Sequence, residues 1–145
     1  MAKFVYKFEA VKKVKETLEK KVQKEVAVIE IQIDKLMMEY DKLTGEVMAS
    51  RTAPIRHNVT AGELKFKNGY EVCLEKERIS ILNQINKLKE KRKIKMSELV
   101  QKSKEHTIFE TLEDNYSENF KNEQNHLDMQ VIDELATQKF VRQNK

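Results

Sequence analysis

The 145-residue sequence has no tryptophan, one cysteine, one proline and three glycines. A single cysteine excludes an internal disulfide and is typical of a reducing compartment. With so few turn-forming residues, the chain has little material for the many connections of a globular fold. No segment approaches the ~20 apolar residues of a membrane span, and no apolar region of ~7–15 residues follows the basic N-terminus as in a secretory signal. The sequence therefore favours a cytoplasmic, helical protein without direct membrane insertion.

The most informative feature that is present is an apolar stripe between residues 22 and 47. Its steps alternate four and three residues, the heptad spacing that holds one helix face against a partner helix. Most residues between these positions are polar, and 36 % of the whole chain is charged, against ~25 % in an average protein. We expect half of a coiled coil rather than the wall of a globular core. The stripe consists of Val22, Val26, Ile29, Ile33, Leu36, Tyr40, Leu43 and Val47.

The heptad spacing fails around the sole proline, Pro54. Proline removes a backbone donor and restricts the preceding residue, so a helix break is expected here. Thr60 and Glu63 then have the spacing of a capping box, which marks the start of a second helix. We predict helices over residues 3–48 and 61–141, joined by a connection over residues 49–60.

A short connection makes neighbouring helices antiparallel. The predicted fold is therefore all-α: an antiparallel two-helix coiled-coil hairpin, with the second helix longer than the first, forming a single coiled-coil domain over residues 1–145. The expected partners of the apolar stripe on the second helix are Leu74, Ile81, Ile85 and Leu88.

Folding back at the connection would place Phe4 near Glu105 and leave the end of the second helix without a partner. The stripe on the first helix is expected to continue backwards through Leu18 and Val14. The unpaired end carries its own sparser stripe, and such apolar residues need a partner. We therefore expect an interaction surface at this end. Its stripe consists of Phe109, Leu112, Tyr116, Phe120, Leu127, Val131 and Leu135.

Residues typical of catalysis or metal binding are scattered. His57, His106 and His126 are too far apart in sequence to share a helix face as metal ligands. Cys73 is closely followed by two glutamates, an electronegative setting that disfavours the reactive thiolate. The sequence predicts no enzyme, no catalytic residue, no metal site and no cofactor.

Charge is distributed unevenly along the chain. Residues 61–105 carry twelve Lys and Arg against seven Asp and Glu, whereas residues 106–145 carry four against eight. The most basic run extends from Lys87 to Lys95, and basic helices are attracted to nucleic-acid phosphate. This run lacks interleaved aromatic residues and is followed by an acidic segment, so a solvated coiled-coil flank is favoured. A basic nucleic-acid-associated coiled coil remains the alternative, although we expect no nucleic acid as partner.

Several scattered residues, together with the length, the hairpin and the basic composition, resemble the FliJ family, small coiled-coil proteins of the bacterial flagellar type III export apparatus. The resemblance covers essentially the whole chain. In the C-terminal part, the family's Glu-Gln pair is followed by an acidic pair, for which Leu127-Asp128-Met129 and Asp133-Glu134-Leu135-Ala136 are two open alignments. The residues that carry the resemblance are Phe4, Phe8, Phe109-Glu-Thr-Leu112, Tyr116, Glu123-Gln124 and Leu127-Asp128.

The resemblance implies a coiled coil similar to the central stalk of rotary ATPases, located at the cytoplasmic face of the inner membrane. The open end of such a hairpin enters the ring of the hexameric export ATPase FliI, and other surfaces engage the export gate protein FlhA and export chaperones. The equivalent stalk of a virulence-type secretion system is a further alternative. We place the ATPase-ring contact at Phe4, Tyr6, Phe8, Phe109, Leu112, Tyr116, Phe120, Glu123 and Gln124.

Two interpretations remain open for features at either end of the predicted hairpin. The aromatic residues near the N-terminus either contact the ATPase ring or hold the N-terminus against the second helix. Near the connection, Tyr70, Val72, Cys73 and Leu74 are too many apolar neighbours for one seam, because adjacent helix positions point to different sides. They form either a wider core or a docking patch for the export gate, with Tyr70 and Leu74 as the candidate contacts.

Overall fold

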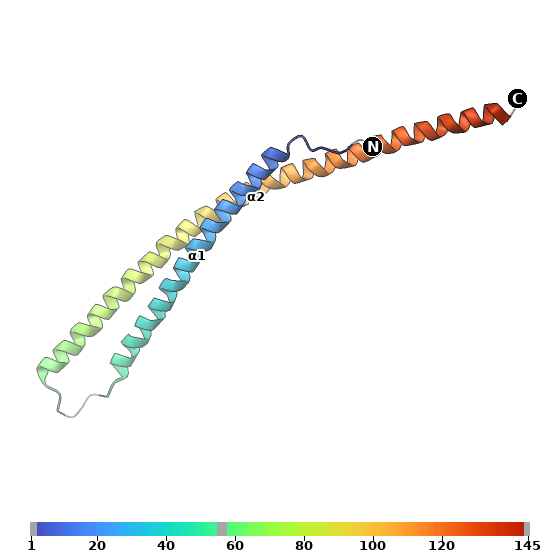
Figure 1. The fold of residues 1–145 in the computed structure, drawn as a ribbon. Helices are drawn as coiled ribbons and strands as arrows, with labels where there is room; N and C mark the ends of the chain where they lie inside the picture. The colour runs from blue at the N-terminus through green and yellow to red at the C-terminus, as the bar shows by residue number, and fades with distance from the viewer. Residues whose placement is uncertain (1–2, 55–57, 144–145) are drawn as a thin grey trace. The chain divides into compact units, whose positions relative to one another are not determined.

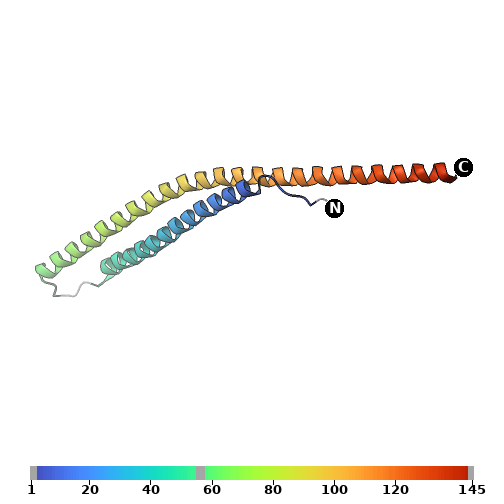
Figure 2. The same ribbon diagram turned by 45° about the horizontal axis from the view of Figure 1, so that its top comes forward.

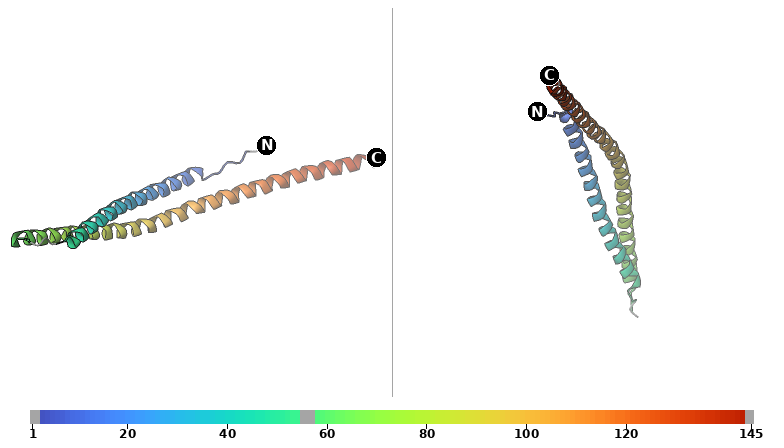
Figure 3. Two further views of the ribbon diagram at one scale, coloured as in Figure 1. Left: turned by 90° about the horizontal axis from the view of Figure 1, so that it is seen from below. Right: turned by 90° about the vertical axis from the view of Figure 1, so that its right-hand side faces the viewer.

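The computed structural model describes residues 3–54 and 58–143, and these form two long α-helices. Helix α1 spans Glu9–Thr52 and helix α2 spans Ala61–Gln143. Between residues 20 and 100 the two helices lie side by side with opposite chain directions (Figure 1), and the described residues include no strand (Figure 3). The prediction of an all-α hairpin with a longer second helix is confirmed.

The chain divides into two compact units. One comprises Lys20–Val100, and the other combines Met1–Glu19 with Gln101–Lys145. The expectation of a single coiled-coil domain over residues 1–145 therefore stays a prediction.

The bounds of α1 differ from the predicted range of 3–48. The helix begins only at Glu9 and continues to Thr52. Its last turns remain regular, because the Thr52 hydroxyl donates to the Met48 carbonyl oxygen over 2.8 Å and the Ala53 N–H donates to that of Ala49 over 3.0 Å. Pro54 follows, where a helix cannot continue its hydrogen bonding. Residues 55–57, with His57, lie outside the described residues.

The start of α2 is the predicted capping box. The Thr60 N–H donates to Glu63 Oε2 over 2.9 Å, and the Glu63 N–H donates to the Thr60 hydroxyl oxygen over 3.3 Å. These reciprocal bonds satisfy two donors that a helix start would otherwise leave unpaired. The hydrogen bond from the Thr60 backbone lowers the pKa of Glu63 below its ordinary value. From this start α2 continues without a break to Gln143.

The core of the Lys20–Val100 unit is the predicted apolar seam, in which α1 and α2 lie side by side (Figure 2). The stripe residues Leu36 and Tyr40 pack at its margin, as does Leu88 from α2, and Val22 and Val26 are also buried. The heptad prediction is therefore confirmed on both helices. The buried cluster consists of Ile29, Ile33, Leu43 and Val47 from α1 and Leu74, Ile81 and Ile85 from α2.

Polar contacts fix how α1 and α2 are aligned near the connection. The Ser50 hydroxyl donates to Glu71 over 2.8 Å, and Arg51 donates to Glu75 over 3.0 Å. The first turns of α2 therefore precede its first hydrogen bond to α1. In the other unit the predicted pairing of Phe4 with the neighbourhood of Glu105 is wrong, because the ring of Phe4 instead lies 5.7 Å from that of Phe120.

Candidate functional site

The N-terminal residues 3–8 are not helical and lie beside α2 (Figure 1), and their aromatic rings pack against rings of α2. Phe4, Tyr6 and Phe8 alternate with exposed residues, and Lys7 and Phe8 form a turn just before α1. The rings of Tyr6 and Phe8 lie 6.2 and 6.3 Å from that of Tyr116. We call this cluster the aromatic clasp; it consists of Phe4, Tyr6, Phe8, Phe109, Tyr116 and Phe120.

Tyr6 is the centre of the aromatic clasp. Only 6 % of its surface is exposed, and its hydroxyl donates to the Phe109 carbonyl oxygen over 2.9 Å. Desolvation, with the nearby Glu113 carboxylate as a lesser cause, raises the pKa of Tyr6 above its ordinary value. The structure therefore has the arrangement in which the aromatic residues hold the N-terminus against α2.

The predicted ATPase-ring contacts differ in the solvent exposure of their side chains. Leu112, Gln124 and the clasp rings of Phe4, Phe8, Phe109 and Phe120 are half-buried, whereas Tyr116 and Glu123 are exposed. The assignment of all nine residues to the ATPase ring stays a prediction, and Tyr6 has little surface to offer a partner.

Ion pairs, rather than apolar residues, join the helices next to the aromatic clasp. Lys12 pairs with Glu113, Lys15 with Glu105 over 2.7 Å, and Glu19 Oε2 lies 2.7 Å from Nδ1 of His106. In the Lys20–Val100 unit, Lys95 pairs with Glu25 over 2.8 Å.

The expected continuation of the apolar stripe through Val14 and Leu18 is wrong. Both side chains are exposed, at 57 % and 38 %. The α1 side chains that reach α2 in this unit are instead the long charged ones, Lys12, Lys15 and Glu19, because they can pair with carboxylates and an imidazole that α2 presents.

We expect acid to destabilise the protein through these ion pairs. The hydrogen bond from Lys15 lowers the pKa of Glu105, and that from Lys95 lowers the pKa of Glu25, both below the ordinary 4.5. A carboxylate with a lowered folded-state pKa stabilises the fold above its unfolded-state pKa and ceases to do so as the pH falls through the folded-state value. The urea unfolding midpoint should therefore be flat near neutral pH and fall below about pH 4.5.

The matched control for this pH dependence is the double variant Lys15→Gln and Lys95→Gln. Its midpoint should be lower at neutral pH and should fall less between neutral and acidic pH, since Glu105 and Glu25 lose the lysines whose hydrogen bonds lower their pKa most. An equal acid-induced loss in the variant and the parent would show that other groups cause it.

Beyond the aromatic clasp, α2 continues through residues 121–143, which we call the distal segment (Figure 2). Every described side chain in it is exposed except that of Gln124, which is half-buried. The predicted stripe residues Leu127, Val131 and Leu135 are 53–59 % exposed. Sequence reasoning missed Ile132 and Phe140, which are equally exposed, because they lie off the stripe; their apolar character was the available signal.

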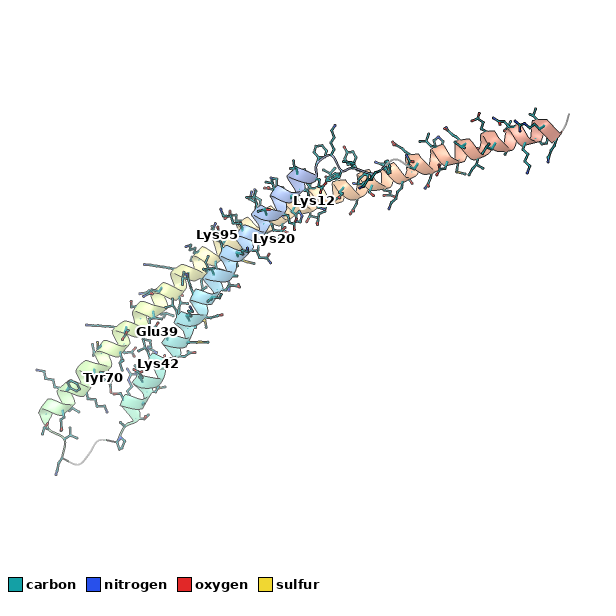
Figure 4. All side chains as sticks on the ribbon, in the orientation of Figure 1. Lys12, Lys20, Glu39, Lys42, Tyr70 and Lys95 are labelled. Carbon is teal, nitrogen blue, oxygen red and sulfur yellow. The ribbon has the colours of Figure 1, made fainter. Side chains whose placement is uncertain are left out.

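The candidate export-gate contacts lie in different surroundings. Leu74 is only 6 % exposed and belongs to the core of its unit, so its side chain is taken up by packing. Tyr70, labelled in Figure 4, is 47 % exposed. Phe66, one helical turn earlier, is 77 % exposed and was missed, although its place one turn before Tyr70 could have indicated it.

The basic run from Lys87 to Lys95 does not form a single positive face. Lys95 pairs with Glu25 and Glu98, each over 2.8 Å, and Arg92 lies 3.7 Å from Glu30. Its remaining lysines lie at successive odd positions of α2, about 200° apart around the helix axis. One phosphate backbone cannot contact them all at once.

The described residues contain neither a candidate metal site nor a candidate membrane span. No group of three or more His, Cys, Asp or Glu side chains in residues 3–54 and 58–143 is placed to hold a metal ion. No helix in the same residues combines the length and apolar character needed to cross a membrane.

Comparison with known proteins identifies the family. A family model described as "Flagellar FliJ protein" matches residues 5–145, which include both helices and most of the aromatic clasp. No curated protein and no solved structure matches the chain. Because the matched region is essentially the whole sequence, the chain belongs to the FliJ family of flagellar export proteins.

Proposed function

We propose that the protein is a non-enzymatic, central-stalk-like component of the flagellar export machinery. It inserts the distal segment into the ring of a hexameric, FliI-like export ATPase and stimulates ATP turnover. It also links this ATPase to a FlhA-like export gate and to export chaperones, at the cytoplasmic face of the inner membrane. The family match supports a role in flagellar export, and the surfaces of the two units support the finer assignments.

The observation that carries the ATPase assignment is the exposure of the distal segment. Leu127, Val131 and Leu135 are more than half exposed on a helix that has no packing partner among the described residues there. Exposed apolar side chains within a polar surface mark interaction sites, and a few such anchors dominate interface energetics while charges set orientation. Residues 106–145 are acidic, with eight Asp and Glu against four Lys and Arg, which suits a ring lumen lined by basic groups.

The aromatic clasp changes which residues make this contact. Because Tyr6 is buried and its hydroxyl donates to the Phe109 carbonyl oxygen, the N-terminal aromatic side chains position α2 and do not contact the ATPase ring directly. Glu123 and Gln124 lie where the distal segment begins, next to the clasp, and they complete the proposed surface with the three apolar anchors.

The gate contact is proposed at the other end of α2. Tyr70 and Phe66 are exposed aromatic residues one turn apart, and aromatic side chains are enriched where interfaces concentrate their binding energy. Leu74 supports this patch from the core rather than by direct contact.

The proposed function is tested by measuring ATP turnover of the cognate export ATPase with and without the full-length chain. We expect the two proteins to co-purify and turnover to rise several-fold, a change in barrier of about 1 kcal/mol. Turnover that stays at the basal rate over a range of chain concentrations would contradict the proposal.

A further inference from the structure

The side of α1 opposite the seam carries a second stripe with heptad spacing. Its positions follow one another at steps of four and three residues, which keeps them on one side of a helix. All are exposed, with Ile31 at 55 % and Met38 at 73 %, whereas the seam residue Ile33 is at 4 %. We call this stripe the lysine face; it consists of Lys24, Val28, Ile31, Lys35, Met38 and Lys42.

The lysine face alternates cations with apolar groups. Among the described residues, Lys24, Lys35 and Lys42 make no ion pair. Lys42 and Glu39, which lies beside the lysine face, are labelled on α1 in Figure 4. From Lys24 to Lys42 the stripe extends about 27 Å along the helix, so its three cations can meet one flat surface together.

We propose that the lysine face binds an anionic phospholipid bilayer, with α1 lying in the plane of the interface. Helices that lie on membranes combine lysines with apolar side chains on one face. The lysine stems can bend so that the ammonium groups reach the lipid phosphates, while Val28, Ile31 and Met38 enter the boundary of the acyl region. The contact is peripheral and needs no membrane span.

The composition of the face favours a bilayer over other acidic partners. A nucleic acid would gain nothing from Val28, Ile31 and Met38, and the face has no aromatic residue for base stacking. An acidic protein helix packed along the stripe would have to cover Lys24, Lys35 and Lys42 at its contact positions and remove water from them, which is costly unless each ammonium group is paired. A headgroup layer leaves these groups hydrated.

This inference deepens the membrane location in the proposed function and concerns a different surface from the ATPase contact. The lysine face belongs to the Lys20–Val100 unit, whereas the distal segment belongs to the other unit. A vesicle assay without ATPase tests the lysine face alone, so either proposal can fail while the other holds.

The test is co-sedimentation of the full-length chain with vesicles of phosphatidylcholine containing about 30 % phosphatidylglycerol, and with pure phosphatidylcholine vesicles. We expect binding to the anionic vesicles only, weakening as salt is added. Replacing Lys24, Lys35 and Lys42 together by Gln should lower the partition coefficient about a hundredfold, because each basic residue near such a surface contributes roughly a factor of five. Ile31→Ser with Met38→Ser should lower it about tenfold.

The matched control replaces Lys87, Lys89 and Lys91 of α2 by Gln. It removes the same charge from the same unit, but only Lys87 and Lys91 lie on one side of the helix while Lys89 faces away, so we expect at most a fewfold loss of binding. Circular dichroism checks that each variant stays helical. The proposal is overturned if the parent chain does not bind anionic vesicles, or if the two lysine triples lose binding equally, since net charge alone would then explain the attraction.

Discussion

Removal of residues 122–145 should return ATP turnover of the export ATPase ring to its basal rate. The truncated chain keeps the aromatic clasp, including Phe120, and the pair of Lys12 with Glu113, so it should stay folded. It lacks Leu127, Val131 and Leu135, the apolar anchors of the proposed ring contact. Because truncating an interface hot spot costs about 2 kcal/mol or more, loss of three removes the stimulating complex. Steady-state ATP hydrolysis with full-length and truncated chains measures this.

A substitution variant sharpens the same prediction. Changing Leu127, Val131 and Leu135 to Ser should reproduce the effect of the truncation. The matched control changes Val72, Ile79 and Leu82 to Ser, apolar residues of α2 that are exposed at 41–54 % but lie outside the distal segment. If both triple variants stimulate the ring equally well, the distal segment is not the ATPase contact.

Ile33→Ala should lower the free energy of unfolding by about 2–4 kcal/mol, the usual cost of truncating a buried isoleucine to alanine. Ile33 is 4 % exposed and lies in the core cluster of the Lys20–Val100 unit. Its replacement leaves a gap between α1 and α2 that a narrow seam has few other residues to fill. Urea unfolding followed by circular dichroism gives the difference.

Ile31→Ala is the control for this prediction, because it removes the same atoms two positions away on a side chain that is 55 % exposed. Its effect should stay within about 0.5 kcal/mol. Similar losses at positions 31 and 33 would show that burial in the seam is not what makes Ile33 stabilising, since Ile→Ala by itself favours the helix at both positions.

The seam could be predicted from the sequence because spacing alone decides it. Steps of four and three residues place Val26, Ile29 and Ile33 on one side of a helix whatever the partner is, and the partner positions on α2 follow from the antiparallel connection. The capping box at Thr60 is equally local, since it depends on two side chains three residues apart.

The features that spacing did not predict depend on contacts far apart in the sequence. The N-terminal residues were expected to be helical, yet residues 3–8 are not. Phe4, Tyr6 and Phe8 instead pack their rings against those of Tyr116 and Phe120 on α2. That alternation of every second residue was the available signal.

The stagger of the helices depends on particular pairs such as Lys15 with Glu105. Apolar periodicity says nothing of which charged side chains will meet, so Val14 and Leu18 were wrongly expected at the interface. Leu74 was expected in the seam and is buried there, whereas the exposure of Tyr70 was left undecided, because a crowded apolar stretch does not by itself say which of its other members pack.

The two units hold their helices together by different means, and this affects how the chain can exchange partners. The buried side chains of the apolar seam cannot separate without leaving a gap that nothing fills. The Lys20–Val100 unit therefore stays folded when contacts in the other unit change. In the other unit the aromatic rings and the ion pairs around Lys12 and Lys15 are contacts that another protein's side chains can replace one for one. Such a replacement changes the number of contacts little, so a partner can displace the N-terminal segment and later release it without a large net cost.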